Sequence, residues 1–111
     1  MEDCVFCKVV AGELPSTKFY EDEDFVVIKN IYPVVEGHLL VVSKKHFVDF
    51  VDLDSGLYGK VLEVVKEVVE KENIENFNLV VNKGRVAGQL ISHFHMHILP
   101  RVEGDGFDFG V

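Results

Sequence analysis

The chain has 111 residues, of which 19 are acidic and 11 are Lys or Arg, and its formal net charge is −8 at pH 7. This length predicts a single domain over residues 1–111, and the excess of acidic residues argues against a broad nucleic-acid interface, although not against a small anionic ligand. No apolar run approaches the roughly 18 residues that span a bilayer, and the N-terminus lacks a basic, hydrophobic signal region. We therefore expect a cytoplasmic protein with no membrane partner.

The first half of the chain predicts a short helix or turn followed by two strands. The segment CVFCKVVAGELPS is expected to end its helix or turn near Gly12, and Pro15 opens a new direction. FVVIK at 25–29 and HLLVVS at 38–43 are apolar runs rich in β-branched residues, separated by the turn-like YPVVEG. This pattern is typical of a strand, a loop and a second strand.

The second half begins with an amphipathic helix from Leu57 to Glu72, whose apolar residues recur at helical spacing. Many of them are valines, which are slightly poor helix formers, so packing against a sheet must stabilise the helix. FNLVVN at 77–82 and SHFHMHIL at 92–99 predict two further strands joined by the loop KGRVAGQ. Strands before and after one long helix favour an α+β fold on a mainly antiparallel sheet.

Three of the five histidines occupy alternate positions of the last predicted strand: His93, His95 and His97. Successive side chains of a strand point to opposite faces, so the three imidazoles should line one face about 6.6 to 7 Å apart while the apolar residues between them face a core. Chance alternation on a half-exposed strand explains a single histidine well, but it explains three in register poorly.

This row of histidines supports two kinds of chemistry, and the row alone does not decide between them. Two or three neutral imidazoles could hold a catalytic zinc, which would make the protein a zinc-dependent hydrolase. Alternatively, one imidazole attacks phosphorus while its neighbours hold the phosphate, since a ring with a pKa of about 6.5 is largely neutral and nucleophilic at pH 7. A hydrogen bond, for example to a backbone carbonyl of the same strand, must then fix its second nitrogen.

Cys4 and Cys7 form a C-x-x-C pair near the N-terminus. In a cytosolic chain such a pair indicates metal ligands or a redox pair before a structural disulfide. The alternative is that both cysteines are small buried hydrophobes.

The motif HFHMHIL resembles the signature of the histidine-triad (HIT) nucleotide-binding family, H-φ-H-φ-H-φ-φ, in which φ is hydrophobic. The resemblance extends to further blocks in the family's order and spacing: CVFCKVVAGELPS, YEDEDFVVIKNIYP, GHLLVVSKKH and NKGRVAGQLISHFHMH. It implies an α+β fold with a HIT-like five-stranded antiparallel sheet, one long helix and a short N-terminal helix. It also implies a homodimer, and we expect apolar helix residues such as Leu57 and Val61 to cover part of its interface.

The resemblance further implies a hydrolase or nucleotidyl transferase that cleaves a purine nucleotide conjugate, a phosphoramidate or a dinucleoside polyphosphate, at its α-phosphate. Matched position by position, His95 is the nucleophile that forms a covalent nucleotidyl-histidine. His97 would hydrogen-bond the phosphate or the bridging atom, and His38 would pack beside the triad. A zinc-dependent hydrolase that uses the histidine row and a nucleotide-binding module without turnover remain as alternatives.

Substrate-binding residues are also implied by the resemblance. Asn30 stands at the ribose-contacting position. The loop that donates hydrogen bonds to phosphate would contain Asn82, Gly88 and Gln89. The purine pocket would be walled by Phe6, Val9, Leu14, Ile28 and Ile31. Leu90 departs from the pattern, because many members carry Ser or Thr there, and this puts the leaving-group preference in doubt.

The same resemblance completes a metal site around the C-x-x-C pair. In relatives with this pair, the cysteines bind zinc together with the histidine of the KKH segment and the first histidine of the triad, which are His46 and His93 here. Two thiolates and two imidazoles suit a tetrahedral, structural zinc. The catalytic work then falls to His95 and His97.

Overall fold

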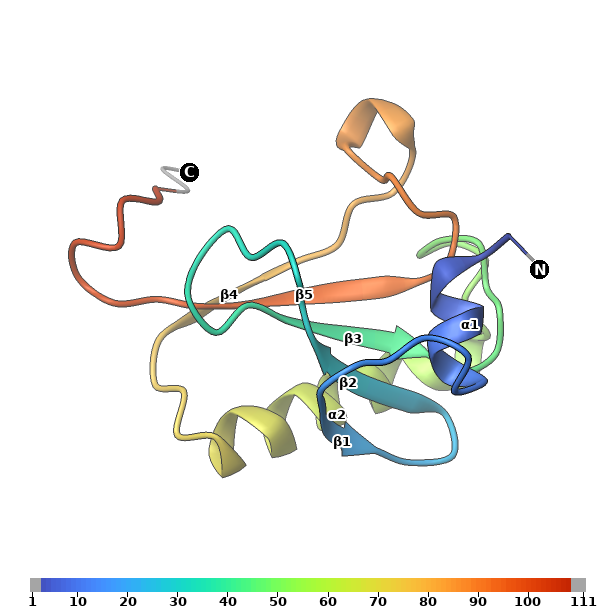
Figure 1. Cartoon of the computed structure of the whole chain (residues 1–111), viewed down its shortest axis with the longest axis horizontal. Helices are drawn as coiled ribbons and strands as arrows, with labels where there is room; N and C mark the ends of the chain where they lie inside the picture. Colours follow the sequence, from blue (N-terminus) through green and yellow to red (C-terminus); the bar gives the residue numbers. More distant parts are fainter. Residues whose placement is uncertain (1–2, 109–111) are drawn as a thin grey trace.

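The computed structural model describes residues 3–108, so residues 1–2 and 109–111 of the predicted domain lie outside the described residues. Five strands form one antiparallel sheet in the order β1-β2-β3-β5-β4, with one long helix and a short N-terminal helix (Figure 1). This architecture confirms the α+β fold that the resemblance implied. No helix in the described range is long and apolar enough to cross a membrane.

The elements follow one another without long gaps along the chain. The strands are β1 (Lys18–Glu21), β2 (Phe25–Lys29), β3 (Leu39–Ser43), β4 (Phe77–Val80) and β5 (His95–Pro100). The α-helices are α1 (Val5–Val10) and α2 (Tyr58–Lys71), and two 3-10 turns, η1 (Ser55–Leu57) and η2 (Arg85–Ala87), precede α2 and interrupt the loop before β5.

Sequence periodicity predicted four of the five strands and missed β1. This strand is the short segment KFYE on the edge of the sheet, where it pairs only with β2 and its register shifts between Lys18 and Tyr20. A half-exposed edge strand of four residues carries too few alternating positions for a clear pattern. The structure also starts β5 at His95 rather than at Ser92, because the His93 N–H turns back to the Ile91 carbonyl at 2.9 Å.

The long helix α2 covers one face of the sheet, beneath it in Figure 1. Its valines enter a core with the inward side chains of β2, β3 and β5, such as Phe25 and Ile98. Val61 is only 3% exposed within this core, and Leu57 packs against the same cluster. The expectation that Val61 covers a dimer interface is therefore wrong, because its side chain is buried within its own subunit.

The opposite face of the sheet carries α1 and the histidines. Phe6 and Val9 of α1 pack on a smaller core formed by outward residues of β2 and β3: Val26, Ile28, Leu40 and Val42. Phe94, Met96 and Ile98 face the α2 side, so the residues that alternate with them face α1. The period-2 prediction for the histidine row is thus confirmed.

Candidate active site and metal centre

His95 begins β5, and the backbone just before it determines the tautomer of its imidazole. Nδ1 of His95 lies 2.7 Å from the carbonyl oxygen of His93. A carbonyl can only accept, so Nδ1 carries the proton and donates it, as the sequence predicted for the attacking histidine. The bond leaves a lone pair on Nε2, which is the form that a nucleophile needs. Burial lowers the pKa of His95, so the ring is neutral near pH 7.

A second chain of hydrogen bonds determines the tautomers of His38 and His97. The backbone N–H of Val34 donates to Nδ1 of His38 at 3.2 Å, so the proton of His38 resides on Nε2. This Nε2 lies 2.8 Å from Nδ1 of His97 and donates to it. His97 therefore keeps its own proton on Nε2, and its ring centroid is 5.2 Å from that of His95. A nucleophilic nitrogen and an N–H donor thus belong to neighbouring rings.

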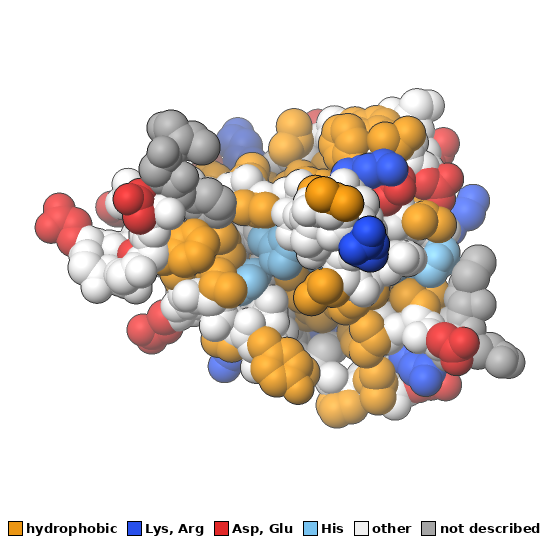
Figure 2. Space-filling view, turned by 90° about the horizontal axis from the view of Figure 1, so that it is seen from above, with side chains coloured by type: hydrophobic (Ala, Val, Ile, Leu, Met, Phe, Trp, Pro, Cys, Tyr) orange, Lys and Arg blue, Asp and Glu red, His pale blue; other side chains and the backbone are white. Residues whose placement is uncertain are grey.

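His38, His95 and His97 are neutral near pH 7 because each ring is at least partly buried, which lowers its pKa. Burial is the largest cause that lowers the pKa of His97 to about 4, and repulsion by His95 and His38 contributes to the shift. Burial alone lowers the pKa of His38. Figure 2 shows histidine side chains reaching the surface in the middle of one face, with hydrophobic side chains around them. A neutral His97 can donate a hydrogen bond from Nε2, but it does not carry a charge in the free protein.

This depressed pKa predicts a loss of stability in acid. Unfolded His97 takes up a proton near pH 6.5, whereas folded His97 does so only near pH 4. Its contribution to the free energy of unfolding is therefore present above about pH 6.5 and is lost as the pH falls toward 4, with a total of about 3 kcal/mol. Urea unfolding at pH 7, 5.5 and 4.5 should show a smaller loss for His97→Asn than for the parent. Equal losses in the two proteins would contradict the assignment.

Asn30 lies beside His38, where the resemblance placed a ribose contact. Its Nδ2 is 3.3 and 3.4 Å from the two ring nitrogens of His38, and its Oδ1 accepts the backbone N–H of Tyr32 at 2.8 Å. The side chain thus shapes the loop that carries Val34. Sequence analysis missed Val34, because a backbone N–H acts there and any non-proline residue offers one.

The five predicted purine-wall residues divide into a buried and an exposed group. The buried ones lie under or within α1: Phe6, Val9 and Ile28. The Phe6 ring centroid is 4.9 Å from that of His95, so the buried group adjoins this histidine. Leu14 and Ile31 are 37% and 76% exposed, which puts them at a rim. A cavity of about 500 Å³ borders Asn30 and His38, but the three buried residues do not line it.

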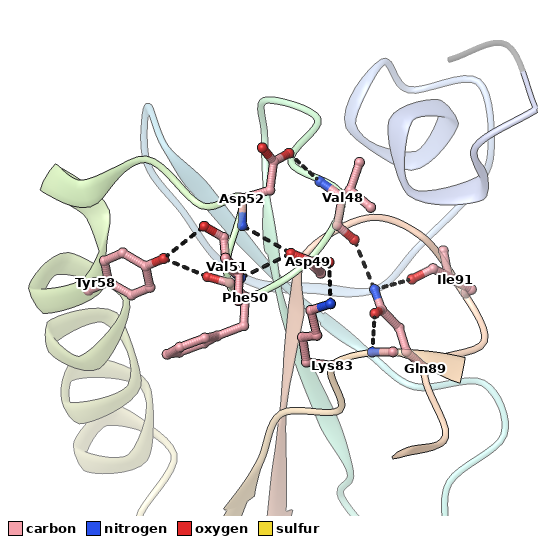
Figure 3. Close-up of polar contacts among 10 residues, drawn as sticks. Val48, Asp49, Phe50, Val51, Asp52, Tyr58, Lys83, Gln89 and Ile91 are labelled. Atoms are coloured by element: carbon pink, nitrogen blue, oxygen red, sulfur yellow. Dashed lines mark hydrogen bonds and ion pairs between the residues drawn. The ribbon is translucent and has the colours of Figure 1, made fainter. Parts of the chain in front are cut away.

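Gln89 holds together the loop between β4 and β5 (Figure 3). Its Oε1 accepts the Gly84 N–H at 2.8 Å, and its Nε2 donates to the carbonyls of Val48 and Ile91 at 2.8 and 3.1 Å. Both ends of this side-chain amide are therefore engaged within the protein. The resemblance placed Gln89 in the loop that donates hydrogen bonds to phosphate, and the structure shows its side chain tying this loop to the segment after His46.

Asn82 and Gly88 lie next to each other in the same loop. Gly88 has φ of +92°, a conformation that favours glycine, and a Cβ there would lie 3.7 Å from Nδ2 of Asn82. Over the described part of the chain, the Asn82 amide makes no side-chain hydrogen bond, so it is available to a ligand. Nearby, Lys83 is less available, because its Nζ lies 3.5 Å from the Asp49 carboxylate.

The four predicted metal ligands converge at the N-terminus of α1. The ligand atoms of Cys4, Cys7, His46 and His93 all lie within 4.8 Å of one another. Nδ1 of His93 is 3.2 Å from Cys4 Sγ, 3.5 Å from Cys7 Sγ and 3.2 Å from His46 Nδ1. Zinc bonds of about 2.0 to 2.3 Å in a tetrahedron would separate such ligand atoms by roughly 3.3 to 3.8 Å. The four donors therefore fit a closed zinc site.

Groups around the four ligands also suit a metal. Nε2 of His93 lies 2.6 Å from the Ser43 carbonyl and donates to it, so Nδ1 presents a lone pair to the other ligands. Burial, followed by the neighbouring Cys4, raises the pKa of the Cys7 thiol. A divalent cation would reverse that shift, because a coordinating thiol is deprotonated.

The histidine row itself does not form a metal site. Within residues 3–108, the Cys4, Cys7, His46 and His93 cluster is the one group of three or more metal-ligating side chains that lie close together. His95 and His97 do not belong to it, since their Nδ1 atoms are bound to a carbonyl and to His38. The geometry therefore does not favour a zinc hydrolase built on the row.

Comparison with known proteins agrees with this arrangement. The family model described as HIT domain matches residues 11–104. An uncharacterized HIT-like protein of Methanocaldococcus jannaschii is 43% identical over 93% of this chain and 82% of its own length. The adenosine 5'-monophosphoramidase hnt1 of Schizosaccharomyces pombe is 36% identical over 88% of this chain and 74% of its own length. The crystal structure of a zinc-bound histidine triad family protein from Mycobacterium smegmatis has a TM-score of 0.87 and 34% identity, and the match covers 97% of this chain and 81% of that one.

Proposed function

This chain belongs to the HIT domain family, and we propose that it hydrolyses or transfers the nucleotidyl group of a purine nucleotide conjugate, cleaving at the α-phosphate through a covalent intermediate on His95. The observation that carries the proposal is the pair of assigned tautomers. His95 keeps a free lone pair on Nε2, and the adjacent His97 keeps an N–H. One nitrogen can attack phosphorus while the other hydrogen-bonds the phosphate or the departing atom.

The first step forms a bond between Nε2 of His95 and the α-phosphorus and breaks the bond from phosphorus to the leaving group. Positive charge develops on the His95 ring during attack, and the carbonyl of His93, 2.7 Å from Nδ1, stabilises it. Nδ1 of His97 already accepts the His38 proton, so His97 assists departure with a hydrogen bond from its Nε2–H to the leaving atom, which departs as a phosphate or as an amine that carries its own proton. Water subsequently attacks the phosphorus and releases the nucleoside monophosphate from His95.

The loop between β4 and β5 supplies the polar groups for the phosphate. The Asn82 amide has no competing hydrogen bond in the described chain, and the bend at Gly88 keeps the backbone close to it. Gln89 contributes by holding this loop in place through its three hydrogen bonds. Preorganised donors of this kind offset the charge that grows on the phosphoryl oxygens.

We expect a phosphoramidate to be a better substrate than a dinucleoside polyphosphate. The relative from Schizosaccharomyces pombe named adenosine 5'-monophosphoramidase supports this order. A polyphosphate leaving group would also bring several negative charges to a chain with a net charge of −8, in which Lys83 already pairs with Asp49. The test is a turnover screen with adenosine phosphoramidate, diadenosine polyphosphate and their guanosine counterparts. No turnover of any of them by the zinc-loaded protein would reject the proposed function.

Zinc is proposed as the metal of the second site, held by Cys4, Cys7, His46 and His93. The zinc-bound relative from Mycobacterium smegmatis and the tetrahedral spacing of the donors support this choice. A bound zinc would neutralise two thiolates and cross-link α1 to the sheet. The site is closed by four protein ligands, so zinc has no position for substrate.

A homodimer is proposed from the family resemblance. β4 is an edge strand of the sheet, and its Phe77 and Leu79 side chains are 37% and 39% exposed. Pairing with a second copy would satisfy the free hydrogen-bonding groups of such an edge and cover these side chains. Sedimentation velocity at micromolar concentration should show a species of about twice the chain mass of 12.6 kDa. A single species of chain mass would contradict the prediction.

A further inference from the structure

We propose that the four metal ligands position the nucleophile as well as stabilising the fold, and that they do so through the peptide unit between His93 and Phe94. Zinc bound by these ligands would hold the carbonyl of this peptide where it accepts the Nδ1 proton of His95. The consequence for turnover rests on the proposed function. The structural consequence, a zinc-dependent tautomer of His95, does not.

His93 is held at both ends of its imidazole. The side chain is 0% exposed, and Nδ1 contacts the other three ligands at 3.2 to 3.5 Å. On the far side of the ring, Nε2 donates to the Ser43 carbonyl at 2.6 Å. These contacts at both ends of the ring restrain the backbone at residue 93, and the carbonyl that His95 uses belongs to this residue.

The peptide unit between His93 and Phe94 is also held from its other side. Its N–H, which belongs to Phe94, donates to the carbonyl of Phe47 at 2.6 Å. Phe47 directly follows the ligand His46 in the chain. The two histidine ligands thus hold one peptide unit, His93 through its own backbone and His46 through its neighbour. The Ser43 N–H of β3 donates to the Phe94 carbonyl at 3.3 Å, but the His93 carbonyl lies one residue further from β5 and outside its regular pairing with β3.

The cysteine ligands also help to position the Phe6 ring, which packs against His95. Phe6 stands between Cys4 and Cys7 in α1, and its ring centroid lies 4.9 Å from that of His95 and 5.7 Å from that of His93. α1 has only six residues, and a helix of this length is not stable by itself in water. Its position depends on its buried side chains and on the cysteines at its start. Metal binding would therefore also keep the Phe6 ring packed against His95.

Loss of the metal should make the His93 carbonyl mobile before it disturbs the other hydrogen bonds of the site. When residue 93 can move, the carbonyl no longer selects the Nδ1–H form, and His95 also populates the Nε2–H form. That form lacks the lone pair that attacks phosphorus. His38 and His97 provide an internal control, because the Val34 N–H sets their tautomers on the other side of the cluster.

The test is imidazole 15N NMR of the full-length protein, without substrate, in the zinc-loaded form and after removal of zinc by chelation. Spectra are recorded well below the melting temperature of the depleted protein. We expect His95 to be the Nδ1–H tautomer in the loaded protein and a mixture of the Nδ1–H and Nε2–H tautomers in the depleted protein, while His38 and His97 keep their tautomers. If zinc only stabilises the fold, its removal would lower the melting temperature and leave the tautomer of His95 unchanged.

Two results would overturn the proposal: His95 keeps the Nδ1–H form after zinc removal, or His38 and His97 change as much as His95. Should the depleted parent unfold, a zinc titration of the parent in concentrated sucrose supplies the same comparison, because an excluded osmolyte favours the folded state, and circular dichroism checks that the protein stays folded throughout. The fraction of Nδ1–H at His95 should then rise in parallel with zinc occupancy, and a constant fraction overturns the proposal.

Turnover measured on the same samples separates this inference from the proposed function. Zinc removal should lower kcat for adenosine phosphoramidate by about 10-fold or more, as is typical when a group that orients a catalytic residue is lost. An absence of turnover in both forms would reject the proposed function, whereas the NMR comparison would still decide the zinc-dependent tautomer. An unchanged kcat beside an altered tautomer would overturn the catalytic part of the inference.

Discussion

Replacing His95 with Asn should lower turnover of a nucleotide phosphoramidate by roughly 10⁴-fold or more, as expected when the covalent step is deleted. Asn keeps a polar side chain of similar reach but has no Nε2 to attack phosphorus. The affinity for a nucleoside monophosphate should change little, since Asn30, Asn82 and the Phe6 wall remain. Steady-state kinetics and calorimetric titration of the monophosphate check the two parts separately.

The matched control for this variant is His97→Asn on the same face of the same strand. This variant should lose less turnover than His95→Asn if His97 only holds the phosphate or assists departure of the leaving group. Mass spectrometry of rapidly quenched parent reactions, kept away from acid because phosphoimidazoles are acid-labile, should find the nucleotidyl adduct on His95. An adduct on His93 or His97, or a His95→Asn protein with a near-parental rate, would contradict the assignment and favour a zinc-dependent reaction.

The second large effect concerns zinc and the cysteines. The purified parent should contain about one zinc per chain, and a Cys4→Ser, Cys7→Ser double variant should lose it. Ligand bonds to a structural zinc contribute directly to the free energy of folding. We therefore expect the melting temperature to fall by more than about 10 °C, which corresponds to at least about 2 kcal/mol in a domain of this size. A measurable part of the activity should remain, since the cysteines do not touch substrate.

The control for the zinc prediction is the parent protein treated with chelator. If the cysteines act through the metal, the chelated parent and the double variant should melt at similar temperatures, and added zinc should restore only the parent. Zinc loss without any change in melting would show that the metal is incidental. A double variant that melts far below the chelated parent would instead assign the effect to packing of the thiols.

Local patterns in the sequence were sufficient for the main elements and for the residues of the histidine row. Alternation over six residues put His93, His95 and His97 on one face, because a strand has a fixed period of two. The apolar spacing of α2 likewise predicted a helix that covers the sheet. The family resemblance then supplied the metal ligands, and the structure brings those four side chains together.

Several features of the site depended on contacts between distant segments. Cys4 and His93 are 89 positions apart, and no local pattern relates them. The interior position of Val61 and the exposure of Ile31 follow from how whole elements pack, and a helix period alone does not say which apolar side chains remain free. The edge strand β1 escaped prediction because pairing with β2, rather than its own composition, makes it a strand.

The amino-acid sequence by itself determined which histidines share one face of the sheet, whereas only the tertiary structure decided their tautomers and hydrogen-bond partners. The tautomer of His95 depends on the His93 carbonyl, and that of His97 depends on the Val34 N–H through His38. Both are backbone groups that nearly every residue possesses, so they leave no signature in the sequence. Their effect arises only when folding brings the loop after β2, the start of β3 and the start of β5 within hydrogen-bonding distance.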